Sequence, residues 1–212
     1  MRSLIQHLML GTMIGMMGLA SAAVPDAQSS VAQAAEPVWH NCLTREVWSP
    51  EKQAWCQQTE VLKNLTYTLP QFGTATLSNG TYQNPDTELT VTLLNRPYTI
   101  GFGELAGGTQ AAAVILVANS GGTGNFVHLA VVLDQGPGFI PVSATMLGDR
   151  VNIESVQWRN GQIQVDLISH GPNDGACCPT QPLRQIYRLE GDTLTLVAET
   201  DRSTAQAIPA LY

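Results

Sequence analysis

The chain has 212 residues, of which 44% are hydrophobic and only 13% are charged, about half of the usual ~25%. This length and apolar content suffice for one buried core and exclude a globally disordered chain. Ten Lys and Arg residues against 17 Asp and Glu residues give a net charge of -7, which argues against binding to nucleic acid or anionic lipid.

Residues 1–22 have the pattern of a secretory signal peptide. Arg2 supplies the positive start, a long uncharged apolar stretch follows, and small residues end the segment at Ala22. We expect cleavage before Ala23 and then a flexible linker over residues 23–38. Since no later segment is long and apolar enough to span a bilayer, we expect an extracytoplasmic protein, periplasmic or secreted, without a membrane span after cleavage.

Residues 39–62 are rich in Trp and Cys and are predicted to form a short helical cap over one end of a sheet. The stretch 49–51 is a helix start, because Ser caps the first amides and Pro fits the first turn. The helix is expected to end near residue 58. Cys42 lies 14 positions before Cys56, a loop length that a disulfide closes easily, so the cap is expected to be stapled.

Residues 63–200 are predicted to form one β domain, followed by a tail over residues 201–212. Apolar runs, alternating or continuous, predict strands at 64–69, 73–77, 89–94, 111–118, 126–133, 151–158, 162–168, 186–189 and 193–197. The runs at 111–118 and 126–133 are apolar almost throughout, which predicts central strands buried on both faces. The fold class is therefore mainly β, an antiparallel sandwich or barrel-like sheet of hairpins with roughly nine or ten strands.

Turn residues separate these strands. Residues 121–124 (Gly-Gly-Thr-Gly) are expected to make a wide hairpin turn, and Asn160-Gly161 is a strong signal for a tight hairpin. Gly148-Asp149 is expected to turn the chain into the next strand, with Arg150 paired to a neighbouring carboxylate such as Asp149.

The sequence does not assemble a catalytic site. Residues 121–124 lack the Lys-Ser/Thr pair and the helix of a phosphate-binding loop. Ser120 lacks the Gly-x-Ser-x-Gly pattern of a nucleophile elbow. His128 has apolar neighbours inside a strand and is expected to be a partly buried, hydrogen-bonded histidine rather than a base. We predict no catalytic residue, no metal site and no cofactor.

The most unusual stretch is residues 169–180, Ser-His-Gly-Pro-Asn-Asp-Gly-Ala-Cys-Cys-Pro-Thr. It places His170, Asp174, Cys177 and Cys178 in one candidate functional loop. The loop can be interpreted as a structural disulfide loop, a redox switch or a thiolate metal site. Adjacent cysteines rarely both point at one ion, and an oxidising compartment favours disulfides, so the structural interpretation is preferred.

Residues 101–190 resemble a secreted β-domain of bacterial envelope proteins. The resemblance rests on Gly-Gly-Thr-Gly, on Leu-Gly-Asp-Arg-Val (147–151) and on His-Gly-Pro followed by Cys-Cys-Pro-Thr. It implies a bacterial, extracytoplasmic protein and no established activity. Members of that family typically carry an acidic segment before the first apolar strand, where Glu104 is here the lone carboxylate, so no calcium site is expected there.

Four cysteines allow three disulfide pairings. Neighbouring Cα atoms lie ~3.8 Å apart across a trans peptide, below the usual ~4.4–6.8 Å of a disulfide, which opposes a bridge between Cys177 and Cys178. The loop from Cys42 to Cys56, however, closes without long-range docking, and the family resemblance is carried by the Cys-Cys segment without the N-terminal cysteines. We therefore expect these two local bridges, with pairings between the cap and the loop as the open alternative.

These observations favour a secreted, non-catalytic envelope module with a binding or structural role. Its partner is expected to be an envelope protein, a glycan or a small ligand, and not nucleic acid. The alternative is a thiol-based redox or metal-handling protein that uses Cys177 and Cys178.

Overall fold

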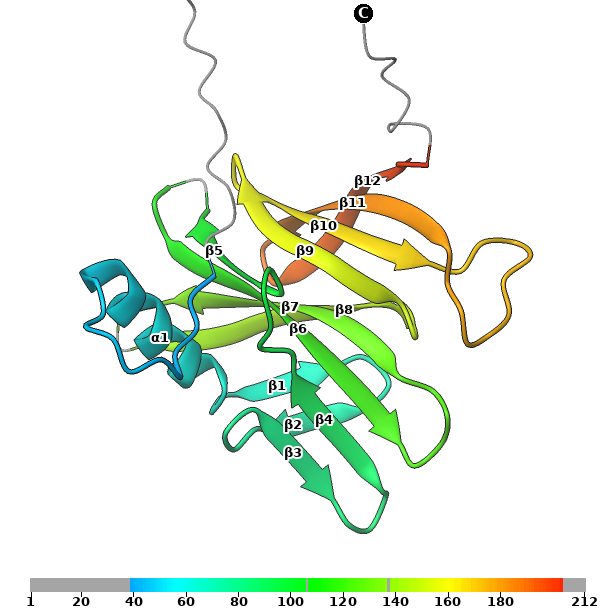
Figure 1. The fold of residues 1–212 in the computed structure, drawn as a ribbon, viewed down its shortest axis with the longest axis horizontal. Coiled ribbons are helices and arrows are strands. Elements are labelled where there is room, and N and C mark those ends of the chain that lie inside the picture. The colour runs from blue at the N-terminus through cyan, green and yellow to red at the C-terminus, as the bar shows by residue number, and fades with distance from the viewer. Residues whose placement is uncertain (1–38, 106, 137, 204–212) are drawn as a thin grey trace, which may run out of the picture. The chain divides into compact units, whose positions relative to one another are not determined.

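The computed structural model describes residues 39–105, 107–136 and 138–203 (Figure 1). The predicted signal peptide (1–22) and linker (23–38) lie outside the described residues, as do residues 204–212 of the predicted tail. The described part contains one helix and twelve strands: α1 (Pro50–Leu62), β1 (Thr66–Leu69), β2 (Gly73–Thr76), β3 (Thr81–Asn84), β4 (Leu89–Leu93), β5 (Ile100–Glu104), β6 (Gln110–Ser120), β7 (Phe126–Asp134), β8 (Phe139–Asp149), β9 (Asn152–Arg159), β10 (Gln162–Ser169), β11 (Gln181–Glu190) and β12 (Thr193–Asp201). Within the same ranges, no helix is long and apolar enough to cross a membrane.

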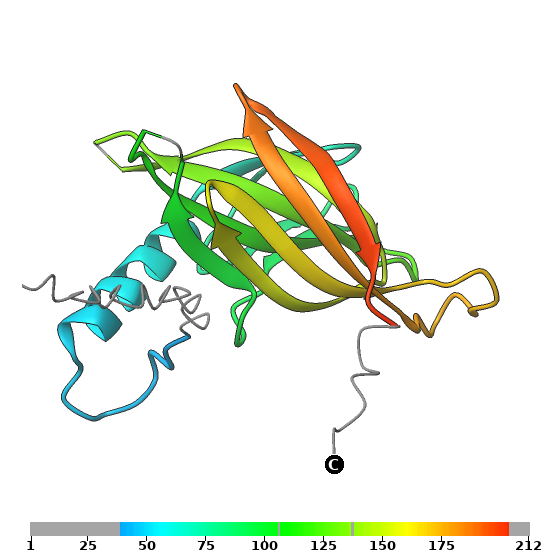
Figure 2. The same cartoon turned by 90° about the horizontal axis from the view of Figure 1, so that it is seen from above.

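The strands form three antiparallel sheets, which confirms the mainly β prediction. The central sheet has the order β3-β4-β6-β7-β8, and β5 pairs with β6 beyond the end of β4. A second sheet has the order β12-β11-β10-β9, and the hairpin β1-β2 forms the third. Figures 1 and 2 show β9–β12 over one face of the central sheet and the β1-β2 hairpin on the other side. The arrangement is therefore a sandwich of layers.

Two hydrophobic cores lie on opposite faces of the central sheet. Alternate residues of β6, such as Val114 and Leu116, pack with the helix and the β1-β2 hairpin, including Tyr67. The intervening residues, such as Ile115, pack with β9, β10 and β11. Side chains of a strand alternate between faces, so strands that are apolar throughout fit only between two covering layers. The prediction of central strands buried on both faces is confirmed.

The helix begins where the sequence indicates and ends later. Ser49 caps it by accepting a hydrogen bond from the amide of Lys52, at 3.3 Å, and Pro50 occupies the first turn. The helix continues to Leu62 rather than ending near residue 58, because its last turns are buried against the central sheet, with Leu62 fully inaccessible. Tertiary burial thus extends a helix beyond its local sequence signal.

The turn chemistry follows the sequence. Asn160 and Gly161 both have positive φ, 52° and 73°, as a two-residue hairpin between β9 and β10 requires. The chain from β8 into β9 turns at Arg150, with φ 53°, so the turn lies one residue later than expected. Arg150 and Asp149 form the expected ion pair.

Three strands lie where the sequence analysis places none: β3, β5 and β8. β8 pairs with β7 along its length but with two register shifts, and its side chains are nearly all half-exposed, so they lack a clean alternation. β5 contains Gly101 and Gly103, which have low strand propensity but allow its backbone to approach β9 closely.

Candidate functional site

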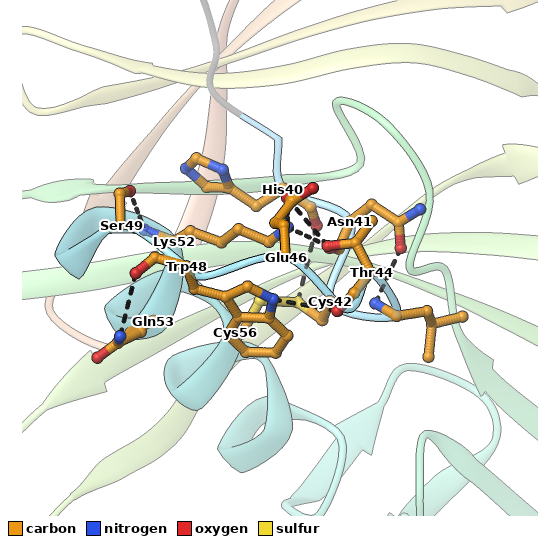
Figure 3. A network of polar contacts seen from close by, with 11 residues as sticks. His40, Asn41, Cys42, Thr44, Glu46, Trp48, Ser49, Lys52, Gln53 and Cys56 are labelled. Carbon is orange, nitrogen blue, oxygen red and sulfur yellow. Dashed lines mark hydrogen bonds and ion pairs between the residues drawn. A yellow bond between two sulfur atoms is a disulfide. The ribbon is translucent and has the colours of Figure 1, made fainter.

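The N-terminal cap is held together by its own polar groups and a disulfide (Figure 3). Cys42 is bonded to Cys56 of α1, which confirms the predicted staple. The side chain of Lys52 is almost buried, and its ammonium donates hydrogen bonds to Thr44 and Glu46. That hydrogen bond lowers the pKa of the Glu46 carboxyl. Lys52 and Glu46 therefore form an ion pair that, with the disulfide, ties the segment before the helix to α1.

His128 lies fully inside the core between the central sheet and the β1-β2 hairpin, more deeply than the expected partial burial. Its Nδ1 lies 3.0 Å from the carbonyl oxygen of Phe126, and its ring contacts Phe72 edge-on. Within the described residues, Nε2 has no hydrogen-bond partner. Burial lowers the pKa of the imidazole, which therefore stays neutral near pH 7, and no solvent-borne molecule reaches it.

The candidate loop, residues 170–180 between β10 and β11, is organised by one carboxylate. Asp174 accepts hydrogen bonds from the amides of Gly171 (2.8 Å) and Thr180 (2.7 Å) and from the hydroxyl of Thr180 (2.9 Å). His170 places Nε2 3.2 Å from the carbonyl oxygen of Ala176. Asp174 thus closes the base of the loop, and these amide hydrogen bonds lower the pKa of its carboxyl.

Replacement of Asp174 with Asn is expected to loosen the loop. The amides of Gly171 and Thr180 both donate to Oδ2, and the neutral oxygen of an asparagine accepts such bonds more weakly than a carboxylate oxygen does. The amides of Gly171 and Thr180 should then exchange with solvent several-fold faster, as measured by hydrogen exchange. In the unmodified protein the folded pKa lies below the ordinary value of 3.8, so the protection should be complete above that pH and fall as pH drops through the folded pKa. Equal protection in both proteins at pH 6 would contradict this role of Asp174.

Cys177 and Cys178 are bonded to each other, with Cα atoms 3.8 Å apart. Together with the bond between Cys42 and Cys56, this is the expected pairing, and all four cysteines of the chain are oxidised. Both loop cysteines are exposed to solvent. In the described part of the chain, no three His, Cys, Asp or Glu side chains gather as a metal site would need.

Two segments that are distant in sequence, the end of the glycine turn and the turn between β8 and β9, meet beside this loop. The amide of Asn125, after the glycine turn, donates to Oδ1 of Asp149 at 2.8 Å, and the amide of Arg150 donates to the carbonyl of Asn125 at 2.7 Å. The guanidinium of Arg150 donates twice to Oδ2 of Asp149, at 2.6 and 3.0 Å. These bonds from Arg150 are the main reason that the pKa of Asp149 is lowered, and the charge of His170 adds a smaller effect. The motifs that carry the family resemblance therefore lie together in space.

A pocket of about 610 Å³ opens at this meeting point, on the face of the central sheet that also carries the core shared with β9–β12. Its floor is formed by cross-strand pairs of β4 and β6, Thr90 with Asn119 and Thr92 with Val117. The walls come from the turn between β8 and β9 and from the disulfide loop. The lining residues are Thr90, Thr92, Leu94, Arg96, Val117, Asn119, Asn125, Val127, Arg150, Val151, Asn152 and Cys177.

The lining carries an excess of positive charge. Arg150 is balanced by Asp149, but Arg96 donates only to neutral acceptors, Oδ1 of Asn152 and the carbonyl of Ile153, each at 3.2 Å. None of the lining residues has a carboxylate. In a chain with a net charge of -7, this is a locally cationic site.

Of the four residues of the predicted functional loop, only Cys177 lines this pocket. The structure places His170 near Asp149 at its side, and Asp174 inside the loop, where it acts on loop geometry. Sequence reasoning did not identify Arg96 or the threonines of β4 as site residues. The alternation of Thr90 and Thr92 with buried leucines and valine did mark them as facing away from one core.

No known family matches this chain, and neither a curated protein nor a solved structure matches it. The family resemblance of residues 101–190 stays a prediction.

Proposed function

We propose that this protein is an extracytoplasmic binding module that holds a small polar ligand in the pocket beside the Cys177–Cys178 loop. The observation that carries the proposal is the convergence of three separate segments on one concave, polar site with an apolar strip in its floor. The presence of two disulfides and the absence of free thiols suit an oxidising compartment, as the sequence of residues 1–22 also indicates.

A binding role suits the chemistry of the lining better than catalysis. The lining side chains are threonines, asparagines, arginines, aliphatic residues and an oxidised cysteine. These groups bind and orient ligands, but this set lacks a general base near neutral pH. His128, the one buried histidine among the described residues, belongs to the opposite core and cannot supply that base.

Thr92→Trp tests the proposal, because an indole at this position in the floor fills the pocket without entering a buried core. We expect that members of a panel of saccharides and short peptides bind the full chain in ligand-observed NMR and that this variant abolishes their binding. Thr195→Trp on the exposed strand β12 is the matched control and should bind normally. A panel without binders, or binders that Thr92→Trp leaves unaffected, would refute the pocket as the binding site.

A thiol-based redox role is the second candidate, favoured by the solvent exposure of both loop cysteines. A reducing dithiol would transfer two electrons and two protons to the bridge, leaving two cysteine thiols and a disulfide in the donor. Thiol titration in glutathione buffers separates the candidates. Reduction of Cys177 and Cys178 within the range of biological glutathione potentials supports the redox role. A bridge that stays oxidised throughout that range refutes the redox role, and the binding function then remains as the single candidate.

A further inference from the structure

We infer that the ligand of this pocket is an acidic saccharide whose carboxylate is held by Arg96 with support from Arg150. This inference rests on the proposed binding function and deepens it by naming the ligand class. It combines three features of the site: its uncompensated charge, its free hydrogen-bonding groups and its position on a sheet face.

The charge favours an anion. Arg96 has no ion pair among the described residues, and its hydrogen bonds to Asn152 and Ile153 fix the guanidinium through one nitrogen, Nη2. Arg150 is paired with Asp149 through Nε and Nη2, so its Nη1 stays available. Two fixed guanidinium groups on one concave surface without a lining carboxylate provide the donors that a carboxylate accepts.

The hydrogen-bonding groups favour a hydroxylated ligand. Within the described residues, neither Thr90 nor Thr92 uses its side-chain hydroxyl in a hydrogen bond, so each can donate and accept. Asn125 and Asn152 both line the pocket and accept bonds through Oδ1, which leaves their amide NH₂ groups as potential donors. The apolar side chain of Val117, beside Thr92 in the floor, offers a surface for the C–H face of a sugar ring.

The position of the pocket disfavours a peptide as the source of the carboxylate. An extended peptide gains most of its affinity by adding a strand to an open sheet edge. Here the floor consists of β4 and β6, whose backbones are paired with each other, so side chains rather than backbone groups face the ligand. In the glycine turn, the amides of Gly121 and Asn125 already bond to Asn119 and Asp149, so these two are not free to bind a phosphate.

The test compares acidic saccharides with their neutral counterparts. The probes are trimers of galacturonate, glucuronate and mannuronate, each also as its methyl ester, which removes the charge and keeps the ring. Calorimetric titration of the full chain is expected to show at least one acid that binds more tightly than its ester. Arg96→Gln should weaken that binding on the order of tenfold and leave the ester unaffected. Arg45→Gln, which removes an exposed arginine of the cap with no ion pair in the described residues, is the matched control and should change nothing.

The outcomes separate this inference from the proposed function. If each ester binds as well as its acid, or if no acid binds, the ligand is not an acidic saccharide. The inference is also wrong if Arg96→Gln and Arg45→Gln bind the acid with the same affinity. The binding function itself survives these results as long as another ligand binds the full chain and is lost in Thr92→Trp. It falls if no member of the panel binds or if that variant has no effect.

Discussion

Replacing both Cys42 and Cys56 with serine is expected to lower the free energy of unfolding by about 2–4 kcal/mol. The bond joins residues 14 positions apart and ties the segment before the helix to α1. Its loss gives the unfolded chain more freedom and removes the support that holds Trp55 against Phe102. Equilibrium unfolding in urea, followed by tryptophan fluorescence, measures the difference.

The matched control is the double replacement of Cys177 and Cys178 with serine. A bridge between neighbours closes so small a ring that it hardly constrains the unfolded chain, so global stability should stay nearly unchanged. If this control loses as much stability as the replacement of Cys42 and Cys56, then the loop contributes to the core and the structural assignment of the two bridges is wrong.

Gly103→Ala is expected to cost about 1–3 kcal/mol, the usual range for overpacking a core. A Cβ at this position would lie 3.0 Å from Cδ1 of Trp158 and still closer to its Cβ and Cγ. The indole cannot swing aside freely, because its Nε1 donates to the carbonyl of Gly101 at 3.0 Å. Either β5 or β9 must therefore move, and the shift should appear as a lower midpoint of urea unfolding.

Gly122→Ala provides the comparison for this prediction. A Cβ at Gly122 meets no atom within 4 Å, and its backbone does not require glycine, so the change should be close to neutral. Equal midpoints for the two variants would show that Trp158 and β5 tolerate the added methyl group and that close packing does not explain Gly103.

The parts of the fold that follow from the sequence are those with strong local signals. The apolar runs of β6 and β7 and the Asn160-Gly161 hairpin carry the signal for strand or turn within their own residues. β8 does not, because its half-exposed side chains depend on the layers on both sides. β5 does not either, since the reason for a glycine at position 103 is the close contact with Trp158, which lies 55 positions later in the sequence.

In the candidate site, too, the features with local signals could be predicted and those that depend on distant residues could not. Its disulfide loop could be recognised from the adjacent cysteines and the Asp174 turn, which are local features. The pocket could not, because Arg96 and Thr92 acquire a role only when β4 lies beside β6 and the loop from β10 reaches over them. The spacing of these residues in the sequence does not show that these segments lie close together in the fold.

The sharing of β6 and β7 between two cores has a consequence for how the protein denatures. Each of these strands sends neighbouring side chains, such as Leu116 and Ile115, into different cores. Removal of the β9–β12 layer would expose one face of the strands on which the helix and the β1-β2 hairpin rest. We therefore expect that neither layer folds on its own and that the domain unfolds as one cooperative unit. A ligand bound on the floor formed by β4 and β6 is then expected to stabilise the distant helical cap as well.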